Sequence, residues 1–196
     1  MTHYISVAIC IIFTYLTGGL NTGYYLVRYS SGKDIRSQFS GNAGASNAGR
    51  ILGKKGFAIS FAGDFLKGFV IIFAARQLHF SNTVLLLQIP ACVLGHIFPL
   101  QLGFRGGKGV STSGGAILAY NPLIFIIAFS ILLVIMFVSK SRLYGGLIGI
   151  LSFGIIAFIL NHSIFECGIL LFTSQIIIYK HKHDIMLAFN KQSNGK

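Results

Sequence analysis

The sequence predicts an all-α integral membrane protein with about seven transmembrane helices, some of them short or broken. Two observations carry this prediction. Hydrophobic residues make up 54% of the chain and charged residues only 10%, whereas soluble domains carry about a quarter charged residues. The apolar residues are also fused into long runs instead of alternating with polar ones at helical or strand spacing. We therefore expect a single polytopic membrane domain over residues 1–196.

The apolar runs give the approximate positions of the membrane helices. They cover residues 5–25, 57–76, 83–100, 116–138, 146–160 and 164–179. A helix needs about 20 residues to cross about 30 Å of hydrocarbon. The first run has no basic segment before it and is followed by a second long run, so we expect a retained span and not a signal peptide.

The fourth run predicts two helices. Residues 109–138 would form a single rod of about 45 Å at 1.5 Å per residue, and Asn121-Pro122 lies near its middle. Two short crossings divided at this proline bring the total to seven spans. With the N-terminus outside and the C-terminus inside, the segments 26–56, 101–108, 139–144 and the tail from 180 onwards share one face.

The basic residues favour this topology. All Lys and Arg residues except Lys67 and Arg76 lie in those four segments, and an excess of Lys and Arg marks the cytoplasmic face. A six-span arrangement would place the basic tail opposite the first loop. The net charge of +12 therefore indicates topology and not nucleic-acid binding. We expect a multi-pass protein of the cytoplasmic membrane, with its site facing the cytoplasm.

The sequence shows no recognisable metal, nucleotide or acyl-carrier site, and we expect no cofactor. The three cysteines lie far apart inside apolar runs, without the spacing of metal ligands or disulfides. A zinc site made of His181, His183 and Asp184 is disfavoured because positions two apart on a helix diverge. The chemistry has to come from ordinary side chains and the backbone.

The first inner segment has the composition of a phosphate-binding loop. Residues 31–56 contain the sequence SGKDIRSQFSGNAGASNAGRILGKKG. Glycine permits the backbone angles that turn consecutive N–H groups toward an anion, and Ser and Asn add neutral donors. Arg50 supplies a planar fork that can hold two phosphate oxygens. The alternative is a flexible loop whose bases only fix topology.

The second inner segment, GFRGGKGVSTSGG at residues 103–115, contains two bases and no acid. It is not a P-loop, because that motif requires glycine at Leu102 and Ser or Thr at Gly109. Arg105 and Lys108 are its candidate phosphate donors. His96 lies just before the segment, where it can contact a substrate headgroup or serve only to end a helix.

Asp64 and Lys67 lie three residues apart inside an apolar run, on one face of the expected helix. Ionisable residues within a membrane span point to function by default. The alternative is a neutralised pair that fixes helix packing.

These motifs together resemble one enzyme family. SGNAGASNAGRILGKKG and GHIFPLQLGFRGGKGVSTSGGAILAYNP are similar to the two signature loops of the bacterial acyl-phosphate:glycerol-3-phosphate acyltransferases, integral membrane enzymes of phospholipid synthesis. The similarity continues in GGLNTGYYLV, DFLKG and HKHDI, in the same order along the chain. It implies a seven-helix fold with the N-terminus outside, whose cytoplasmic loops hold a fatty acyl phosphate and glycerol 3-phosphate. The implied product is lysophosphatidic acid.

The resemblance and the residue patterns give three sets of candidate residues. His96 and His181 are the candidate catalytic residues. The candidate substrate-binding residues are Ser40, Gly41, Asn42, Ser46, Asn47, Arg50, Gly106, Gly107, Lys108 and Thr112. Asp64, Lys67, Arg142 and Asp184 are further candidates.

The sequence departs from the family pattern at several positions. Gly145 stands where the family has a serine that contributes to the site, and Asp184 stands in place of an asparagine. Asn21 replaces the usual proline of the first span, Phe39 a glycine, and Ser46 a threonine. A diverged paralogue with an altered substrate is therefore an alternative to the active acyltransferase.

The implied chemistry matches the available residues. An acyl phosphate is an activated mixed anhydride, so the protein has only to neutralise two phosphates and align a hydroxyl with the carbonyl. The general base is left open among His96, His181 and a substrate phosphate oxygen. A non-enzymatic phosphate or lipid-phosphate carrier is the alternative of another class, but transport favours an internal repeat, which the sequence lacks.

Overall fold

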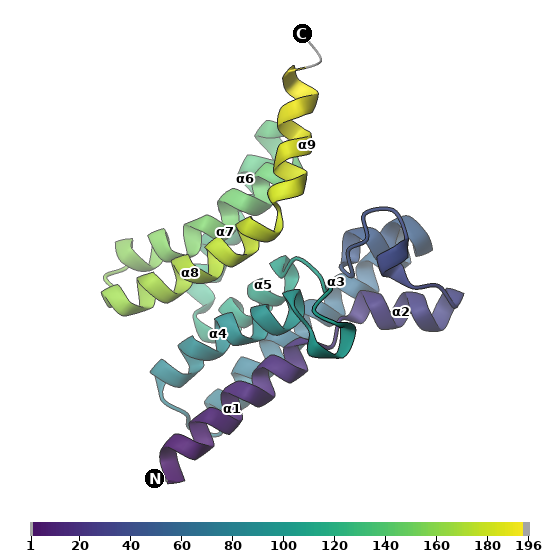
Figure 1. The fold of residues 1–196 in the computed structure, drawn as a ribbon. Coiled ribbons are helices and arrows are strands. Elements are labelled where there is room, and N and C mark those ends of the chain that lie inside the picture. The colour runs from purple at the N-terminus through teal and green to yellow at the C-terminus, as the bar shows by residue number, and fades with distance from the viewer. Residues whose placement is uncertain (1, 194–196) are drawn as a thin grey trace. The chain divides into compact units, whose positions relative to one another are not determined.

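The computed structural model describes residues 2–193, and within this range it contains helices and no strand. The α-helices are α1 (Thr2–Gly18), α2 (Thr22–Ser31), α3 (Ala45–Gln77), α4 (Asn82–Ile97), α5 (Val110–Tyr120), α6 (Pro122–Ser139), α7 (Arg142–Ile159), α8 (Ile164–Lys180) and α9 (Lys182–Ser193) (Figure 1). Short 3-10 turns lie at Ile35–Ser37 (η1) and Leu100–Leu102 (η2). The prediction of an all-α protein is confirmed.

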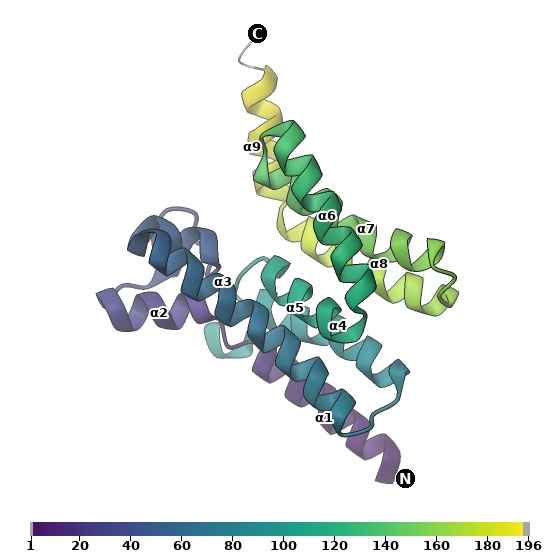
Figure 2. The same ribbon diagram turned by 180° about the vertical axis from the view of Figure 1, so that it is seen from behind.

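The chain forms two compact units, Met1–Pro122 and Leu123–Lys196. In the first unit α1, α3, α4 and α5 lie side by side, and α2 packs on α3 (Figures 1 and 2). In the second unit α7 packs along α8. Every residue that the sequence predicts for the two phosphate-binding loops belongs to the first unit.

Small residues allow the helices of the first unit to approach closely. A Cβ atom on Gly95 would lie 2.0 Å from the Tyr15 carbonyl oxygen, so α4 touches the backbone of α1. A Cβ on Gly68 would lie 2.2 Å from the Thr112 oxygen, and one on Gly115 would lie 1.9 Å from the Phe65 oxygen, so α3 and α5 are equally close. Such small-residue contacts are typical of helix packing in membranes, where lipid is as apolar as the core.

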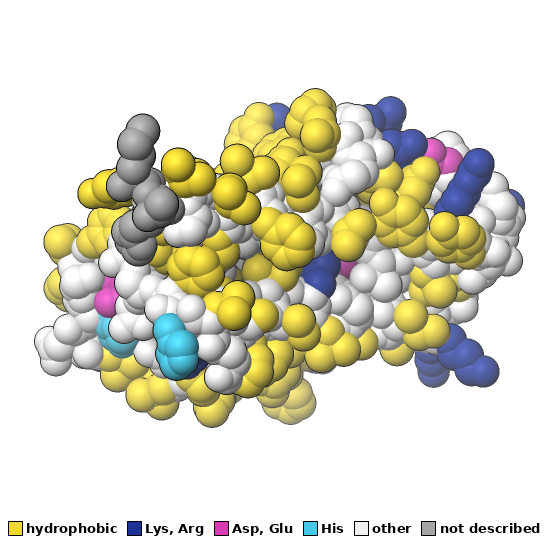
Figure 3. Space-filling model, turned by 90° about the horizontal axis from the view of Figure 1, so that it is seen from below, with side chains coloured by type: hydrophobic (Ala, Val, Ile, Leu, Met, Phe, Trp, Pro, Cys, Tyr) yellow, Lys and Arg dark blue, Asp and Glu magenta, His cyan; other side chains and the backbone are white. Residues whose placement is uncertain are grey.

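Five segments are long and apolar enough to cross a membrane: Tyr4–Ser31, Ala45–Gln77, Asn82–Leu102, Pro122–Ser139 and Arg142–Ile159. Hydrophobic side chains accordingly cover much of the face drawn in Figure 3. The predicted division of the fourth run is confirmed, because α5 ends at Tyr120 and α6 begins at Pro122. With 11 residues, α5 is about 16 Å long, and it is not among these five segments. Arg76 donates a hydrogen bond to the carbonyl of Tyr120 and thereby caps the C-terminus of this helix.

The structure corrects two expectations about the N-terminal third. The apolar run 5–25 is not one helix, since α1 ends at Gly18 and α2 starts at Thr22. The expected loop 26–56 is largely helical, with irregular backbone only between Ser31 and Ala45, around η1. Arg50 therefore lies on the first turns of α3. Glycines in this segment misled the prediction because they serve helix packing as well as turns.

Gly53 folds the start of α3 back on the rest of the helix. Its φ of 70° and ψ of −164° are not helical, and only glycine adopts such angles readily. A Cβ on Gly49 would lie 2.9 Å from Phe57, and one on Gly56 would lie 2.9 Å from the Ala48 carbonyl oxygen. The first two turns of α3 therefore pack against the turns that follow the bend.

Candidate active site

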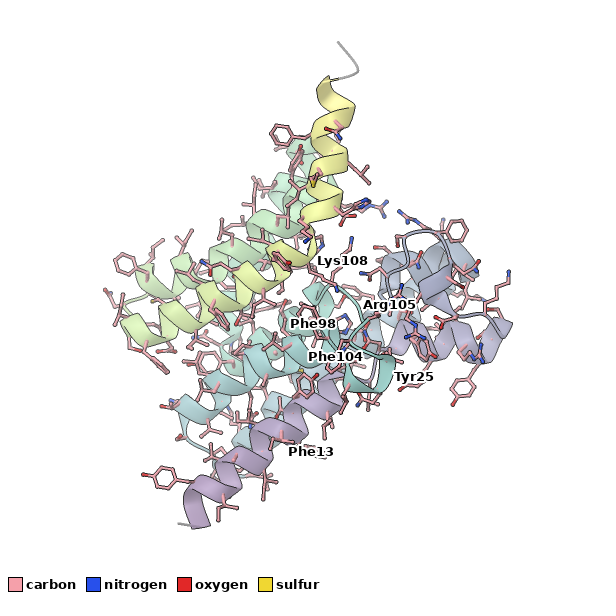
Figure 4. The ribbon with its side chains drawn as sticks, viewed as in Figure 1. Phe13, Tyr25, Phe98, Phe104, Arg105 and Lys108 are labelled. Carbon is pink, nitrogen blue, oxygen red and sulfur yellow. The ribbon has the colours of Figure 1, made fainter. Side chains whose placement is uncertain are left out.

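The two inner loops lie against each other in the first unit. The N–H of Ala43 donates to the carbonyl of Gly106 at 3.4 Å. Arg36, on η1, donates through Nη1 to the carbonyl of Leu102 at 2.7 Å. Figure 4 shows Arg105 and Lys108 on the loop before α5, at the same end of the unit as Tyr25 of α2. The two segments that the sequence singles out for phosphate binding therefore form one surface.

Asp34 holds Arg36 in this position. The carboxylate of Asp34 accepts from Nη2 at 2.6 Å and from Nε at 3.0 Å, and also accepts from the backbone N–H of Arg36. The hydrogen bonds from Arg36 lower the pKa of Asp34 below its ordinary value, and the carboxylate raises the pKa of Arg36. Sequence reasoning missed this link between the loops, because its only signal is an acid and a base two residues apart.

The N-terminus of α3 has no side-chain cap and has a basic residue nearby. Its N-cap residue is Gly44, so no side chain occupies the first backbone N–H groups. Ser46 and Arg50 are exposed and four residues apart, which places them on one face of the first turn. Among residues 2–193 the Arg50 side chain has neither a hydrogen-bond nor an ion-pair partner. A phosphate here would meet the positive end of the helix, a hydroxyl and a guanidinium.

The N-terminus of α5 has the same features. Its N-cap residue is Gly109, with a φ of 91° that favours glycine, and again no side-chain cap is present. Lys108 is half-buried immediately before it. Each loop therefore leads into a helix N-terminus without a side-chain cap and carries a basic residue beside it.

Gly106 and Gly107 hold the second loop closed. The N–H of Gly106 donates to the carbonyl of Ile97 at 3.2 Å, and that of Gly107 donates to the carbonyl of His96 at 3.0 Å. A Cβ on Gly107 would lie 1.9 Å from Nε2 of His96. These N–H groups are engaged with the main chain, so the contribution of Gly107 is the room it leaves for the His96 ring.

His96, Asp64 and Lys67 meet beneath this loop. Nζ of Lys67 lies 2.9 Å from Oδ1 of Asp64 and 2.9 Å from Nδ1 of His96. His96 and Asp64 are buried, at 3% and 1% exposure. The predicted Asp64–Lys67 ion pair is confirmed. Asn21 completes the cluster, since its amide donates to the carbonyl of His96 at 3.0 Å. No sequence pattern indicates this contact.

Asn47 organises the first loop. It is buried, and its amide donates to the carbonyls of Ile35 and Gln38, both at 3.0 Å. Its Oδ1 accepts from the N–H of Ser40 at 3.4 Å. These bonds engage its polar atoms within the loop, so Asn47 presents Ser40 to the surface.

The remaining candidates of the first unit take several positions. Asn42 accepts from the N–H of Gly44 at 2.9 Å and so forms the turn that enters α3. Gly41 has a φ of 65° in the preceding turn, where its N–H donates to the carbonyl of Gln38, and Phe39 has a φ of 44° although it is not glycine. Thr112 is fully buried on α5, and its Oγ1 has no hydrogen-bond partner in the part of the chain that is described.

His181, Arg142 and Asp184 belong to the second unit. His181 is buried at the end of α8, and its Nδ1 lies 2.9 Å from the carbonyl of Ile177. A ring nitrogen next to a carbonyl oxygen is a donor, so Nε2 of a neutral His181 is an acceptor. Arg142 is exposed at the start of α7. Asp184 is half-buried in the first turn of α9, where the helix dipole favours a carboxylate.

Comparison with known proteins gives a consistent picture. The sequence profile described as glycerol-3-phosphate acyltransferase matches residues 8–191. The chain is 39% identical over 186 residues to glycerol-3-phosphate acyltransferase 1 of Desulfitobacterium hafniense, covering 95% of this chain and 92% of the relative. It is 36% identical over 190 residues to glycerol-3-phosphate acyltransferase of Bacillus subtilis, covering 94% of this chain and 95% of that relative.

Solved structures agree with the sequence relatives. The fold is similar to that of PlsY (YgiH), an integral membrane glycerol 3-phosphate acyltransferase, in its glycerol 3-phosphate form, with a TM-score of 0.88 and 31% identity over 95% of this chain and 93% of that one. The lysophosphatidic acid form of the same enzyme gives a TM-score of 0.83 at 29% identity, with the same coverage of both chains. These matches extend over nearly the whole chain, and the chain therefore belongs to the glycerol-3-phosphate acyltransferase family.

Proposed function

We propose that this protein transfers a fatty acyl group from an acyl phosphate to glycerol 3-phosphate in the cytoplasmic membrane, with its site open to the cytoplasm. The observation that carries the proposal is the pair of helix N-termini without side-chain caps, those of α3 and α5. Each has a basic side chain beside it, and the loops that lead into them touch at Ala43 and Gly106. Two adjacent anion sites fit two substrates that both carry phosphate.

The reaction needs little beyond positioning and charge neutralisation. A hydroxyl oxygen of glycerol 3-phosphate attacks the acyl carbonyl carbon, the bond from that carbon to the phosphate oxygen breaks, and inorganic phosphate leaves. The hydroxyl proton passes to a base. Arg50 and Lys108, with the N–H groups of the two helix N-termini, stabilise the phosphates and the developing negative charge. The product is lysophosphatidic acid.

Three groups are candidate bases: His96, His181 and an oxygen of a substrate phosphate. Nδ1 of His181 faces a carbonyl, which leaves Nε2 as an acceptor. A His181→Gln variant tests this candidate: loss of a general base costs about 10²–10⁴-fold in turnover, whereas a base elsewhere leaves most of the turnover intact.

The binding role of the two basic residues is tested with purified protein, palmitoyl phosphate and labelled glycerol 3-phosphate. Arg50→Ala and Lys108→Ala should each lower kcat/KM by about 10- to 150-fold, because a hydrogen bond to a charged group contributes about 1.5–3 kcal/mol. Lys55→Ala removes an exposed base from the same stretch of α3 and serves as the matched control. If all three variants turned over like the parent protein, the two-site assignment would be wrong.

A further inference from the structure

We infer that Lys67 and Asp64 fix the His96 ring in its neutral Nε2–H form, so that His96 acts as a hydrogen-bond donor toward the second loop and not as the general base. Lys67 and Asp64 are then positioning residues. The consequence for turnover rests on the proposed function, whereas the protonation state of the ring does not.

The contact between Lys67 and His96 sets the role of Nδ1. Nζ of Lys67 lies 2.9 Å from Nδ1 of His96. An ammonium group has three N–H donors and no acceptor. The ring nitrogen that faces it must therefore accept, and the proton of the neutral ring is on Nε2.

The other contacts of Lys67 hold its ammonium group in this position. Its remaining donors go to the carbonyl of Leu20 at 2.8 Å and to Oδ1 of Asp64 at 2.9 Å. Three donors thus meet three acceptors. Asp64 is itself held by the backbone N–H of Thr22 at 3.2 Å, so the ammonium is fixed from both sides.

The other protonation states conflict with the surroundings. A proton on Nδ1 would face Nζ of Lys67 and also Nδ2 of Asn21, which lies 3.4 Å away and is a donor too. Oδ1 of Asp64 is 3.7 Å from Nδ1, beyond hydrogen-bond distance. An imidazolium would put a second positive charge next to the ammonium in a buried site, where charges interact strongly.

The orientation of the Asn21 amide is fixed by its second contact. Nδ2 of Asn21 donates to the carbonyl oxygen of His96 at 3.0 Å. Turning the amide over would place two oxygens at that distance. Asn21 therefore presents a donor to Nδ1 and supports the same tautomer.

The Nε2 edge of the ring faces the second loop. A Cβ on Gly107 would lie closer to Nε2 than to any other ring atom, at 1.9 Å. Gly107 precedes Lys108 and the N-terminus of α5, where an anion is expected. A neutral donor at this position adds to the positive potential of the loop. A general base here would need an unprotonated Nε2, whereas Nε2 of His96 keeps its proton.

The tautomer can be measured directly on the full-length protein in detergent or nanodiscs, labelled with ¹⁵N at histidine. We expect Nδ1 of His96 to give the shift of an unprotonated ring nitrogen and Nε2 that of a protonated one, unchanged between pH 6 and 9. The ring signal that disappears in the His96→Gln variant is the signal of His96. In Lys67→Met the signal should titrate, because Asp64 then stabilises a protonated Nδ1, while Lys55→Met should leave it unaltered. A wild-type ring protonated at Nδ1 overturns the inference.

Turnover provides the second measurement. The Gln side chain can donate a hydrogen bond but cannot accept a proton as a base. His96→Gln should therefore keep turnover within about tenfold of the parent, and His96→Ala should lose more. If His96 were the base, both variants would lose about 10²–10⁴-fold alike. A protein without any acyltransfer would refute the proposed function but would leave the tautomer measurement valid.

Discussion

Asp34 and Arg36 are the pair of charged residues that tie the first loop to the second. The pKa of Asp34 is lowered by the hydrogen bonds from Arg36. A carboxyl whose pKa is lower in the folded state stabilises that state above its unfolded pKa, and this contribution is lost as the pH falls through the folded pKa.

This pair predicts an acid-sensitive contribution to stability. We expect the thermal unfolding temperature of the wild-type protein to fall as the pH is lowered from about 6 to below the ordinary Asp value of about 4. Asp34→Asn should be less stable than wild type at pH 6, and the difference should shrink as the pH falls. A difference that stayed constant over this range would mean that the carboxylate contributes nothing through its charge.

Single residues also show what sequence could and could not reveal. Arg50, Lys108 and the Asp64–Lys67 pair were predicted because charge inside or beside an apolar run is conspicuous in any sequence. The contact of Asn21 with His96 joins residues 75 positions apart, and the bond from Arg36 to Leu102 joins residues 66 apart. In both cases the acceptor is a main-chain carbonyl, which leaves no pattern in the sequence, so only the fold reveals these links.

At the level of elements, the bend in α3 decides whether the first loop can reach the second. Gly53→Ala should destabilise the protein by about 1–3 kcal/mol, because a residue with a Cβ rarely adopts the backbone angles observed at this position. It should also lower the rate of acyl transfer, since straightening α3 would break the contact between Ala43 and Gly106 that joins the two loops. Gly146→Ala, in α7, is the control, because a Cβ at that position meets nothing within 4 Å. Thermal unfolding and turnover of both variants check this, and an unaffected Gly53→Ala protein would contradict it.

Gly145, where the resemblance to the family implies a serine, lies at a close helix contact. A Cβ on Gly145 would lie 2.8 Å from the Leu132 carbonyl oxygen and 2.9 Å from Cβ of Met136, so α7 approaches the backbone of α6. Gly145→Ser should therefore lower stability by about 1–3 kcal/mol, the cost of overpacking, although serine is the residue that the resemblance implies here. Gly146→Ser is the matched control in the unfolding measurement. Equal stability of the two variants would contradict this, because it would show that α6 can shift to make room for the serine side chain without loss of stability.

Elements with a local signal were the ones predicted correctly. The division at Asn121-Pro122 follows from the geometry of proline and appears in the structure at the expected residue. The sequence predicts a loop at the start of α3 because GNAGASNAG is rich in residues that favour turns. Of its glycines, Gly41 does lie in a turn, with a φ of 65°, whereas Gly49 packs against Phe57, a contact that no local pattern indicates.

The distribution of charge over the whole molecule makes a prediction about topology. Lys67 and Arg76, the bases outside the four inner segments, each have partners within the first unit, so neither opposes the predicted orientation. A reporter fused to the C-terminus should be active on the cytoplasmic side and inactive outside, and a fusion after Asn161 should behave in the opposite way. A C-terminal reporter active only outside would overturn the arrangement of seven spans.

The central claim is that the two joined loops bind one acyl phosphate and one glycerol 3-phosphate and transfer the acyl group between them. The most direct measurement follows lysophosphatidic acid and inorganic phosphate together, with purified protein, palmitoyl phosphate and glycerol 3-phosphate, and with palmitoyl-coenzyme A as the alternative donor. We expect one phosphate released for each lysophosphatidic acid formed, and no product from the thioester. Product formed only from the thioester, or phosphate released without product, would contradict the account.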